Sequence, residues 1–347
     1  MPKKDWMVKT DDLDDDQLHV FNAMLDKSCI VTGCAGSGKS VLALIKAQRI
    51  QKEKGNNYQI IVYTKALSSY MASGKETLGL NNNFTYHWSW KNTMGMPSAD
   101  YTIVDEIQDF TKEEIGEFIN ATNKHFFFFG DTAQSVYKAF KDTLPVEDIL
   151  YSFPDYRKTT SNFALYRNYR LPWSVAKIAQ HIGEDLPPLA KSIYRSTETQ
   201  QPYLLRYPTA EEQAEAIIKI IKDRGFDDVA ILMPDSVSVK NFSSLLSQRG
   251  MKVEHKYKGD IQEVNTLNFG TNLPKVMTYH SAKGLQFEAV FIPMIPQIIP
   301  HRTPLYVAMT RTYHFLYLMY SGNMPDLLAE IPKGEYLETT DTTVEDK

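Results

Sequence analysis

Short apolar runs bounded by polar residues recur along the first half of the chain. They predict buried strands at 28–32, 59–63, 101–105 and 125–130, and an apolar helical pattern follows the first of them at 41–47. Strands without polar alternation, separated by helices, are typical of a parallel sheet that is covered on both faces. The first half of the chain therefore predicts an α/β domain of this kind.

A second cycle of the same pattern occupies the remainder of the chain. An amphipathic helical pattern covers 210–224, and further apolar runs predict strands at 227–233, 275–278, 289–292 and 315–320. The whole chain therefore predicts two α/β domains, each built on a mostly parallel sheet.

The domain boundaries follow from these two cycles. A chain of 347 residues is long enough for two domains of ordinary size. We assign 1–158 to the first domain and 159–335 to the second. The remaining segment, 336–347, is polar and acidic, and we expect it to be disordered.

The composition is that of an ordinary globular protein. Hydrophobic residues make up 43% and charged residues 23%, and no apolar run approaches the roughly 20 residues that span a membrane. The N-terminal segment lacks the apolar stretch of a secretory signal, so we expect a cytoplasmic protein. The two cysteines, Cys29 and Cys34, argue against a structural disulfide or a cysteine-rich zinc site. The net charge of −4 argues against unspecific coating of nucleic acid but is compatible with a local basic groove.

The segment GCAGSGKS carries the clearest chemical signal, because it fits the phosphate-binding pattern GxxxxGK[ST]. Its residues are Gly33, Cys34, Ala35, Gly36, Ser37, Gly38, Lys39 and Ser40. The glycines let backbone N–H groups point inward at phosphates, Lys39 reaches the β- and γ-phosphates, and the Ser40 hydroxyl is placed to bind Mg²⁺. A predicted strand precedes the segment and a predicted helix follows it, as this mechanism requires. We therefore expect an ATP site here.

Two adjacent carboxylates, Asp105 and Glu106, close the predicted strand at 101–105. The carboxyl end of a parallel strand lies at the crevice where ligands bind, so Asp105 is placed to hold Mg²⁺ and Glu106 to activate the attacking water. An acidic pair at such a position is also common as a helix cap. The phosphate loop upstream favours the catalytic interpretation.

The order of these and further motifs resembles that of superfamily 1 helicases of the UvrD/Rep type, over nearly the whole chain. The matching segments are Gln17, the phosphate loop, YTKAL at 63–67, TYHW at 85–88, DEIQD at 105–109, GDTAQSVY at 130–137, NYR at 168–170, TYHSAKGL at 278–285 and YVAMTR at 306–311. The resemblance implies two RecA-like domains that hydrolyse ATP with Mg²⁺ in the cleft between them. It also implies an ATP-dependent translocase or helicase that moves along single-stranded DNA from 3′ to 5′.

The resemblance assigns three residues to the base and ribose of the nucleotide. Gln17 would read adenine, and Tyr169 would stack on it. Gln286 stands where the family has a glutamate, and it can still hydrogen-bond a ribose hydroxyl.

The resemblance assigns three further residues to the phosphates. Gln134 and Arg170 would contact the γ-phosphate, and Arg311 would act as an arginine finger. The alternative for Arg311 is a surface or capping arginine. Both arginines lie in the second predicted domain, so ATP would have to bind between the domains for them to reach it.

Aromatic and basic residues in or near the motifs are the expected nucleic-acid contacts, because single strands are held by base stacking and a basic track. The candidates are Tyr63, Lys65, His87, Trp88, Tyr137 and His280. A buried cluster is the alternative for the aromatic residues at 86–90, which we expect in a loop region, and a structural role is the alternative for His280. RNA stays open as the strand, because no residue visibly reads the 2′-hydroxyl.

Departures from the family pattern keep a second hypothesis open. The accessory insertions of large members are missing, which favours a bare two-domain core. Ala139 stands where the family has a base-stacking aromatic residue, and Phe140 follows one position later, either as its replacement or as a core residue. The second hypothesis is a DNA-sensing or clamp-type regulatory ATPase that acts with a partner nuclease or effector, without processive unwinding.

Overall fold

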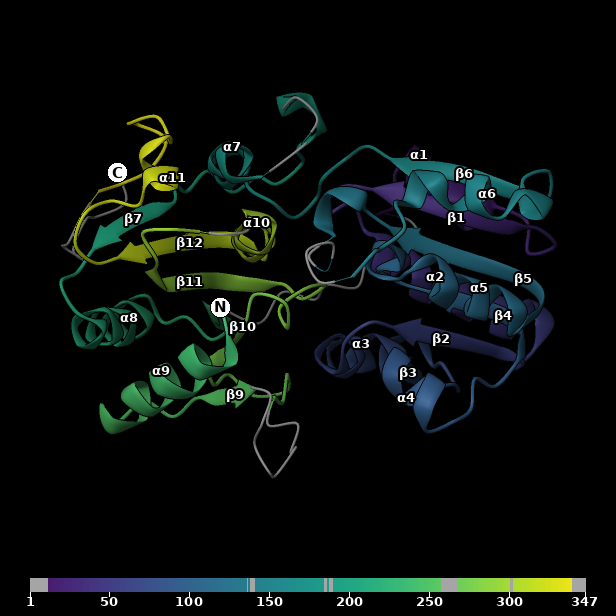
Figure 1. Ribbon diagram of the computed structural model, residues 1–347, viewed down its shortest axis with the longest axis horizontal. Coiled ribbons are helices and arrows are strands. Elements are labelled where there is room, and N and C mark those ends of the chain that lie inside the picture. Colours follow the sequence, from purple (N-terminus) through teal and green to yellow (C-terminus); the bar gives the residue numbers. More distant parts are fainter. Residues whose placement is uncertain are drawn as a thin grey trace. The chain divides into compact units, whose positions relative to one another are not determined.

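The computed structural model describes residues 12–135, 137, 141–183, 186, 190–256, 267–299 and 302–338. The chain divides between Tyr169 and Arg170 into two compact units, the N-terminal unit and the C-terminal unit (Figure 1). The division falls later than the predicted boundary after residue 158, because β6 (Thr160–Leu165) pairs over its whole length with β1 (Ser28–Gly33). The segment that contains β6 therefore belongs to the N-terminal sheet.

The C-terminal unit also extends beyond its predicted end at residue 335. Tyr336 is buried, and the Leu337 N–H donates to the Pro202 carbonyl at 2.9 Å. The Leu337 carbonyl in turn accepts from the Leu204 N–H at 3.0 Å. Residues 336–338 thus depart from the predicted tail and pack with the unit, whereas residues 339–347 lie outside the described residues.

The N-terminal unit is built on a six-stranded sheet whose spatial order is β3-β2-β4-β5-β1-β6, with parallel pairing between neighbours. Besides β1 and β6, its strands are β2 (Tyr58–Val62), β3 (Phe84–Tyr86), β4 (Ala99–Val104) and β5 (Thr122–Gly130). Its helices are α1 (Asp15–Asn22), α2 (Lys39–Lys54), α3 (Lys65–Leu78), α4 (His87–Asn92), α5 (Lys112–Asn120) and α6 (Ile149–Ser152). Both faces of this sheet are covered, since the four consecutive phenylalanines at 126–129 of β5 are all buried although alternate residues point to opposite faces.

The C-terminal unit repeats this architecture with the spatial order β7-β12-β11-β8-β10-β9, again with parallel pairing. Its strands are β7 (Tyr203–Arg206), β8 (Val229–Met233), β9 (Glu254–Lys256), β10 (Lys275–Thr278), β11 (Phe287–Ile295) and β12 (Thr312–Tyr320). Its helices are α7 (Trp173–Ile182), α8 (Ala210–Arg224), α9 (Ser236–Gln248), α10 (Arg302–Met309) and α11 (Asp326–Ala329). The two parallel sheets confirm the predicted α/β fold class.

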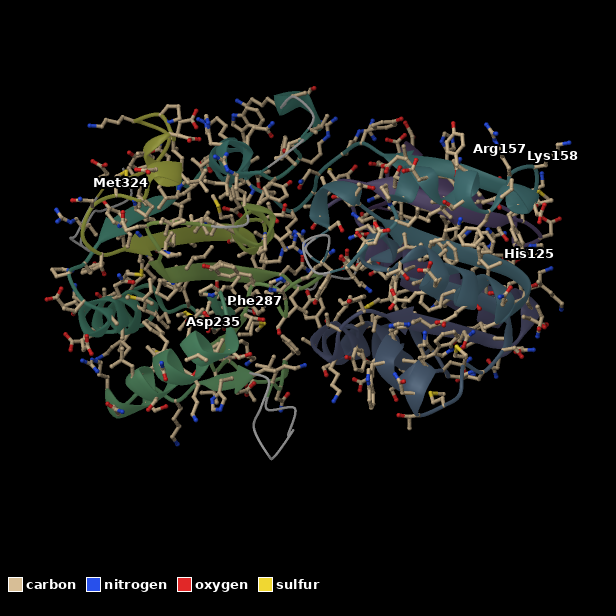
Figure 2. All side chains as sticks on the ribbon, in the orientation of Figure 1. His125, Arg157, Lys158, Asp235, Phe287 and Met324 are labelled. Carbon is tan, nitrogen blue, oxygen red and sulfur yellow. The ribbon has the colours of Figure 1, made fainter. Side chains whose placement is uncertain are left out.

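Three adjacent strands of the N-terminal sheet set the position of the candidate site. The strands β4, β5 and β1 are neighbours and run parallel, so their carboxyl ends meet at one edge of the sheet. The opposite edge, where the strands begin, carries His125 near the start of β5 and Arg157 and Lys158 just before β6 (Figure 2). The loops with the predicted chemistry all follow the carboxyl ends.

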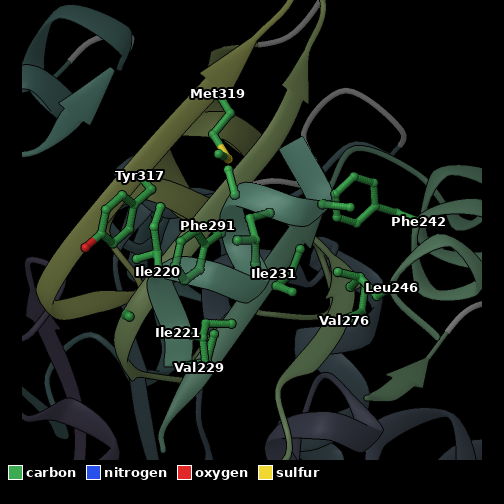
Figure 3. Packing of buried hydrophobic residues seen from close by; sticks show 14 of the residues in the cluster. Ile220, Ile221, Val229, Ile231, Phe242, Leu246, Val276, Phe291, Tyr317 and Met319 are labelled. Atoms are coloured by element: carbon green, nitrogen blue, oxygen red, sulfur yellow. The ribbon is translucent and has the colours of Figure 1, made fainter. Parts of the chain in front are cut away.

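The core of the C-terminal unit packs α8 and α9 against its sheet (Figure 3). Phe291 at the centre of β11 is fully buried, and its ring stacks on that of Tyr317 from β12, with centroids 4.5 Å apart and planes at 7°. Ile231 of β8 lies in the same cluster. No helix in the described part of the chain is long and apolar enough to cross a membrane.

We expect Phe291→Ala to destabilise the C-terminal unit by about 3–5 kcal/mol, because it removes a fully buried ring and leaves a cavity beside Tyr317. The measurement is the shift of the urea unfolding midpoint. Val237→Ala on α9 is the control, since Val237 is 68% exposed and should change stability by no more than about 0.5 kcal/mol. Equal midpoints for the two variants would show that this stacked pair does not hold the unit together.

Candidate functional site

The predicted phosphate loop connects β1 to the start of α2, as its mechanism requires. Gly36 and Gly38 have φ of 78° and 89°, a conformation that side chains other than glycine rarely adopt. A Cβ added at Gly33 would lie 2.6 Å from the Ser37 hydroxyl and 2.9 Å from Leu165 Cβ. The glycines therefore permit both the turns of the loop and its close approach to β6.

The side chain of Lys39 lies across this loop. Lys39 is buried, and its Nζ donates to the Gly33 carbonyl at 2.6 Å and to the Cys34 carbonyl at 3.0 Å. The ammonium group therefore lies against the turn of the phosphate loop.

The segment after β6 holds the loop from its other side. The Asn168 amide donates to the Ala35 carbonyl at 2.5 Å, and the Tyr169 N–H donates to the Gly36 carbonyl at 3.0 Å. Asn168 is buried, and the sequence reasoning gave it no role. The signal for it was its place at the start of the NYR motif.

The two predicted metal ligands meet at this edge of the sheet. The Ser40 hydroxyl donates to Asp105 Oδ2 at 2.6 Å, although the residues are 65 positions apart. Asp105 is fully buried, and this burial together with the neighbouring Glu106 raises the pKa of Asp105 above its usual value. A hydroxyl oxygen and a carboxylate oxygen are ligands that suit Mg²⁺, and a cation here would neutralise the buried acidic pair. The residues present therefore fit Mg²⁺.

The described residues contain no group of three or more histidine, cysteine or acidic side chains arranged to hold a metal ion. Magnesium in phosphate sites does not need such a group, because it keeps several waters and takes one or two protein ligands plus phosphate oxygens. The pair of Ser40 and Asp105 matches that requirement.

Glu106 adopts an unusual backbone conformation. It has φ 59° and ψ 42°, in the left-handed region, and it is buried. A residue other than glycine pays about 1–3 kcal/mol there, and such strain is found most often at active sites. The Glu106 N–H donates to Asp105 Oδ1 at 3.0 Å, and Glu106 Oε2 accepts from the Gln108 amide at 2.5 Å. The sequence gave no sign of this conformation.

Gln108 is the functional candidate that sequence reasoning passed over. Its amide donates to Glu106, while its Oε1 accepts from the Asp131 N–H at 2.9 Å. Asp131 Oδ2 accepts from the Gln134 amide at 2.6 Å. Gln134 is 2% exposed and so lies within this buried network rather than on the surface. The only sequence signal for Gln108 was its position inside the DEIQD motif.

Gln17 is held between helix α1 and the phosphate loop. Its Oε1 accepts from the Asp14 N–H at 3.1 Å in a capping box, and its Nε2 donates to the Ser37 carbonyl at 3.0 Å. The predicted adenine reader thus already uses one donor and its acceptor oxygen within the protein.

Tyr169, the predicted stacking partner of adenine, lies partly at the surface. It is 36% exposed, and its hydroxyl donates to Asp14 Oδ2. Burial and this bond to the carboxylate raise the pKa of Tyr169 to about 12. Gln17 and Tyr169, the two predicted base contacts, therefore both hydrogen-bond to Asp14 at the N-terminus of α1.

Two of the predicted residues of the C-terminal unit are connected by the backbone of their segments. The Phe287 N–H, next to Gln286, donates to the Arg311 carbonyl at 3.0 Å. The Arg311 guanidinium donates from Nε to the Val307 carbonyl at 2.8 Å and from Nη2 to the Thr310 hydroxyl at 2.9 Å. These bonds hold the buried guanidinium against the end of α10.

Arg170 and His280 belong to the same unit. Both are half-buried. Arg170 is the first residue of the unit, and His280 follows the end of β10 by two positions. Each therefore lies in a connection outside the helices and strands.

The predicted nucleic-acid contacts of the N-terminal unit fall into two groups. Lys65 and Trp88 are exposed, Trp88 by 56%. Tyr63 and Tyr137 are half-buried, and their rings lie 4.4 Å apart with planes at 39°. Ala139 and Phe140, the two positions considered for a base-stacking ring, lie outside the described residues.

His87 departs from its predicted role. It begins helix α4, although a loop was expected there, and its ring is buried between those of Phe110 and Phe118, at 4.9 and 5.4 Å. Burial also lowers the pKa of His87, which favours the neutral ring. The ring therefore serves the aromatic core and offers no surface to a base.

Comparisons with known proteins agree with this architecture. A model of the viral superfamily 1 RNA helicase core domain matches residues 29–319. The RNA replication protein of Sclerotinia sclerotiorum debilitation-associated virus is 22% identical over 228 residues, which cover 61% of this chain and 12% of that protein. The chain thus spans a small part of the length of this curated relative.

Two solved structures are similar to the chain, both with low sequence identity. The PRRSV helicase is 13% identical, with a TM-score of 0.49, over 88% of this chain and 54% of that chain. The C-terminal domain of a possible DNA helicase from Lactobacillus plantarum is 21% identical, with a TM-score of 0.38, over 49% of this chain and 98% of that chain. The family model covers most of the chain and so decides the assignment. The chain belongs to the viral superfamily 1 RNA helicase core domain family.

Proposed function

We propose that this chain hydrolyses ATP and uses the hydrolysis to move along a single strand of nucleic acid. The observation that carries the proposal is the meeting of Ser40 and Asp105 at 2.6 Å beside the phosphate loop. This contact brings a phosphate-binding loop and a strained acidic residue, Glu106, to one edge of a parallel sheet. That combination supports phosphoryl transfer to water, with Mg²⁺ as the cofactor.

The phosphate loop and Lys39 would hold the β- and γ-phosphates. Lys39 now donates to two carbonyl oxygens of its own loop, so binding exchanges these bonds for bonds to phosphate oxygens. Ser40 and Asp105 would hold Mg²⁺, which when bound supplies positive charge to the phosphate oxygens.

Glu106 would act as the general base. Its carboxylate takes a proton from the attacking water, the water oxygen forms a bond to the γ-phosphorus, and the bond from that phosphorus to the bridging β–γ oxygen breaks. ADP leaves with the electron pair of that bond. We propose that Gln134, Arg170 and Arg311 contact the γ-phosphate during this step, as the family resemblance implies.

The kind of strand and the direction of movement are the finer part of the proposal. The family description and the name of the viral relative both refer to RNA, so we propose single-stranded RNA as the track. Single-stranded DNA and movement from 3′ to 5′ rest on the UvrD/Rep resemblance alone. Tyr63, Tyr137, Lys65 and Trp88 would supply the rings and the charge that hold the strand.

The decisive experiment is steady-state ATP hydrolysis by the full chain with and without a strand. We use unstructured single-stranded RNA and DNA of the same sequence as probes. We expect kcat to rise by about 5- to 150-fold with one of them, the range typical of coupling between two sites. Turnover that ignores both strands would contradict the motor function, and stimulation by DNA alone would correct the proposed track.

We expect Glu106→Gln to lower kcat for ATP by about 10²–10⁴-fold, the usual contribution of a general base, because the amide cannot accept the proton. ATP should still bind, since the phosphate loop is unchanged, and binding is measured with a fluorescent ATP analogue. Glu113→Gln on α5 is the matched control, because Glu113 is exposed and away from the site. Normal turnover in Glu106→Gln would remove Glu106 from the role of base.

We expect Trp88→Ala to weaken binding of the stimulating strand by about 1–3 kcal/mol, the worth of one stacked base. Fluorescence anisotropy of the labelled strand measures this affinity. Met94→Ala is the matched control, because Met94 is also large, apolar and exposed, by 52%, but has no ring. Equal affinities of the two variants would show that Trp88 does not stack on the strand.

A further inference from the structure

Gln108 connects two loops that follow different strands. Its amide nitrogen donates to Glu106 Oε2 at 2.5 Å, and its amide oxygen accepts from the Asp131 N–H at 2.9 Å. Asp131 in turn accepts from the Gln134 amide at 2.6 Å and from the Ala133 N–H at 3.2 Å. One buried carboxamide therefore joins the proposed base to the turn that carries the proposed γ-phosphate contact.

A glycine makes this connection possible. A Cβ added at Gly130 would lie 2.6 Å from Gln108 Oε1 and 2.7 Å from Ile107 Cγ2. Any other residue at 130 would therefore push the carboxamide away from the Asp131 N–H. The glycine that ends β5 is thus required by the side chain of Gln108.

A second bond attaches the same turn to the backbone of Gln108. The Ser135 hydroxyl donates to the Gln108 carbonyl at 3.1 Å and also lies 3.0 Å from the Thr143 hydroxyl. Two residues further along, the Tyr137 ring contacts that of Tyr63 in a tilted arrangement. Asp131 and Ser135 therefore anchor this turn at Gln108, and Tyr137, a proposed strand contact, follows shortly after it in the sequence.

We propose that Gln108 is a positioning residue that couples strand binding at Tyr63 and Tyr137 to the orientation of the Glu106 carboxylate, an inference that rests on the proposed function. The carboxamide is planar and rigid, so a displacement of its oxygen by Asp131 also moves the nitrogen that holds Glu106. The left-handed backbone of Glu106 is strained, and strain of this kind is maintained only by surrounding contacts. A shift of the turn on strand binding would thus reorient the base.

The test compares kcat for ATP with and without the saturating strand that stimulates the wild type. Gln108→Met removes both side-chain bonds at similar length, and Gln108→Glu keeps an acceptor for the Asp131 N–H but loses the donor to Glu106. We expect the ratio of stimulated to basal kcat to fall to within about twofold of one in both variants. The KM for ATP and the Kd of the strand should stay within about threefold of the wild type, because the proposed contacts to ATP and to the strand are made by other residues.

Gln59→Met is the matched control. Gln59 of β2 also makes two side-chain bonds within the N-terminal unit, donating to the Thr102 hydroxyl at 3.1 Å and accepting from Trp90 Nε1 at 2.9 Å. The Gln59→Met variant loses the same kind of bonds away from the site, so its ratio of stimulated to basal kcat should equal that of the wild type. Thermal melting of each variant shows whether it is folded. If Gln108→Met does not fold, the test is made with Gln108→Glu.

Three outcomes overturn the inference. Basal and stimulated kcat that fall equally in a folded Gln108 variant, with the ratio unchanged, assign Gln108 a structural role only. A Gln59→Met ratio that falls as far as that of the Gln108 variants shows that loss of any buried glutamine uncouples the enzyme. If the strand does not stimulate ATP hydrolysis by the wild type, both the proposed function and the coupling are wrong. This outcome differs from the other two because it appears in the wild type itself.

Discussion

The site depends on the parallel alignment of three adjacent strands. Phe127 of β5 is in register with Cys29 of β1 on one side and with Ile103 of β4 on the other. The chain therefore leaves all three strands at the same edge, and the bond between Ser40 and Asp105 closes the gap between the first and the third. A shift of one strand by one residue would turn its side chains to the other face and separate these groups.

The central strands could be predicted from the sequence, and the edge strands could not. The four strands without a sequence prediction, β3, β6, β7 and β9, occupy the four edges of the two sheets. A central strand in a parallel sheet is covered on both faces and reads as a continuous apolar run, as in the four phenylalanines at 126–129. An edge strand such as β9, with three half-buried residues, carries no such run. The boundary between the units was placed too early for this reason, because β6 was not visible.

The candidate site shows the same division between local and tertiary information. Lys39, Ser40 and Asp105 could be found because their motifs encode a strand, a turn and the start of a helix or loop. His87 and Trp88 could not be told apart, because neighbouring residues of a short helix point to different sides and only packing decides which ring is buried. Gln108 had no local signal beyond its place in the DEIQD motif, since its partner at Asp131 follows a different strand.

The bonds of Gln108 have the strength that a coupling residue needs. Leaving a buried donor or acceptor without a partner costs about 1–3 kcal/mol, so breaking either side-chain bond of Gln108 is unfavourable. Coupling between two sites is typically also about 1–3 kcal/mol. We therefore expect a displacement of Asp131 to reach Glu106 through Gln108 rather than to break a bond. Glu106, whose backbone lies in the strained left-handed region, is the residue at the other end of this connection.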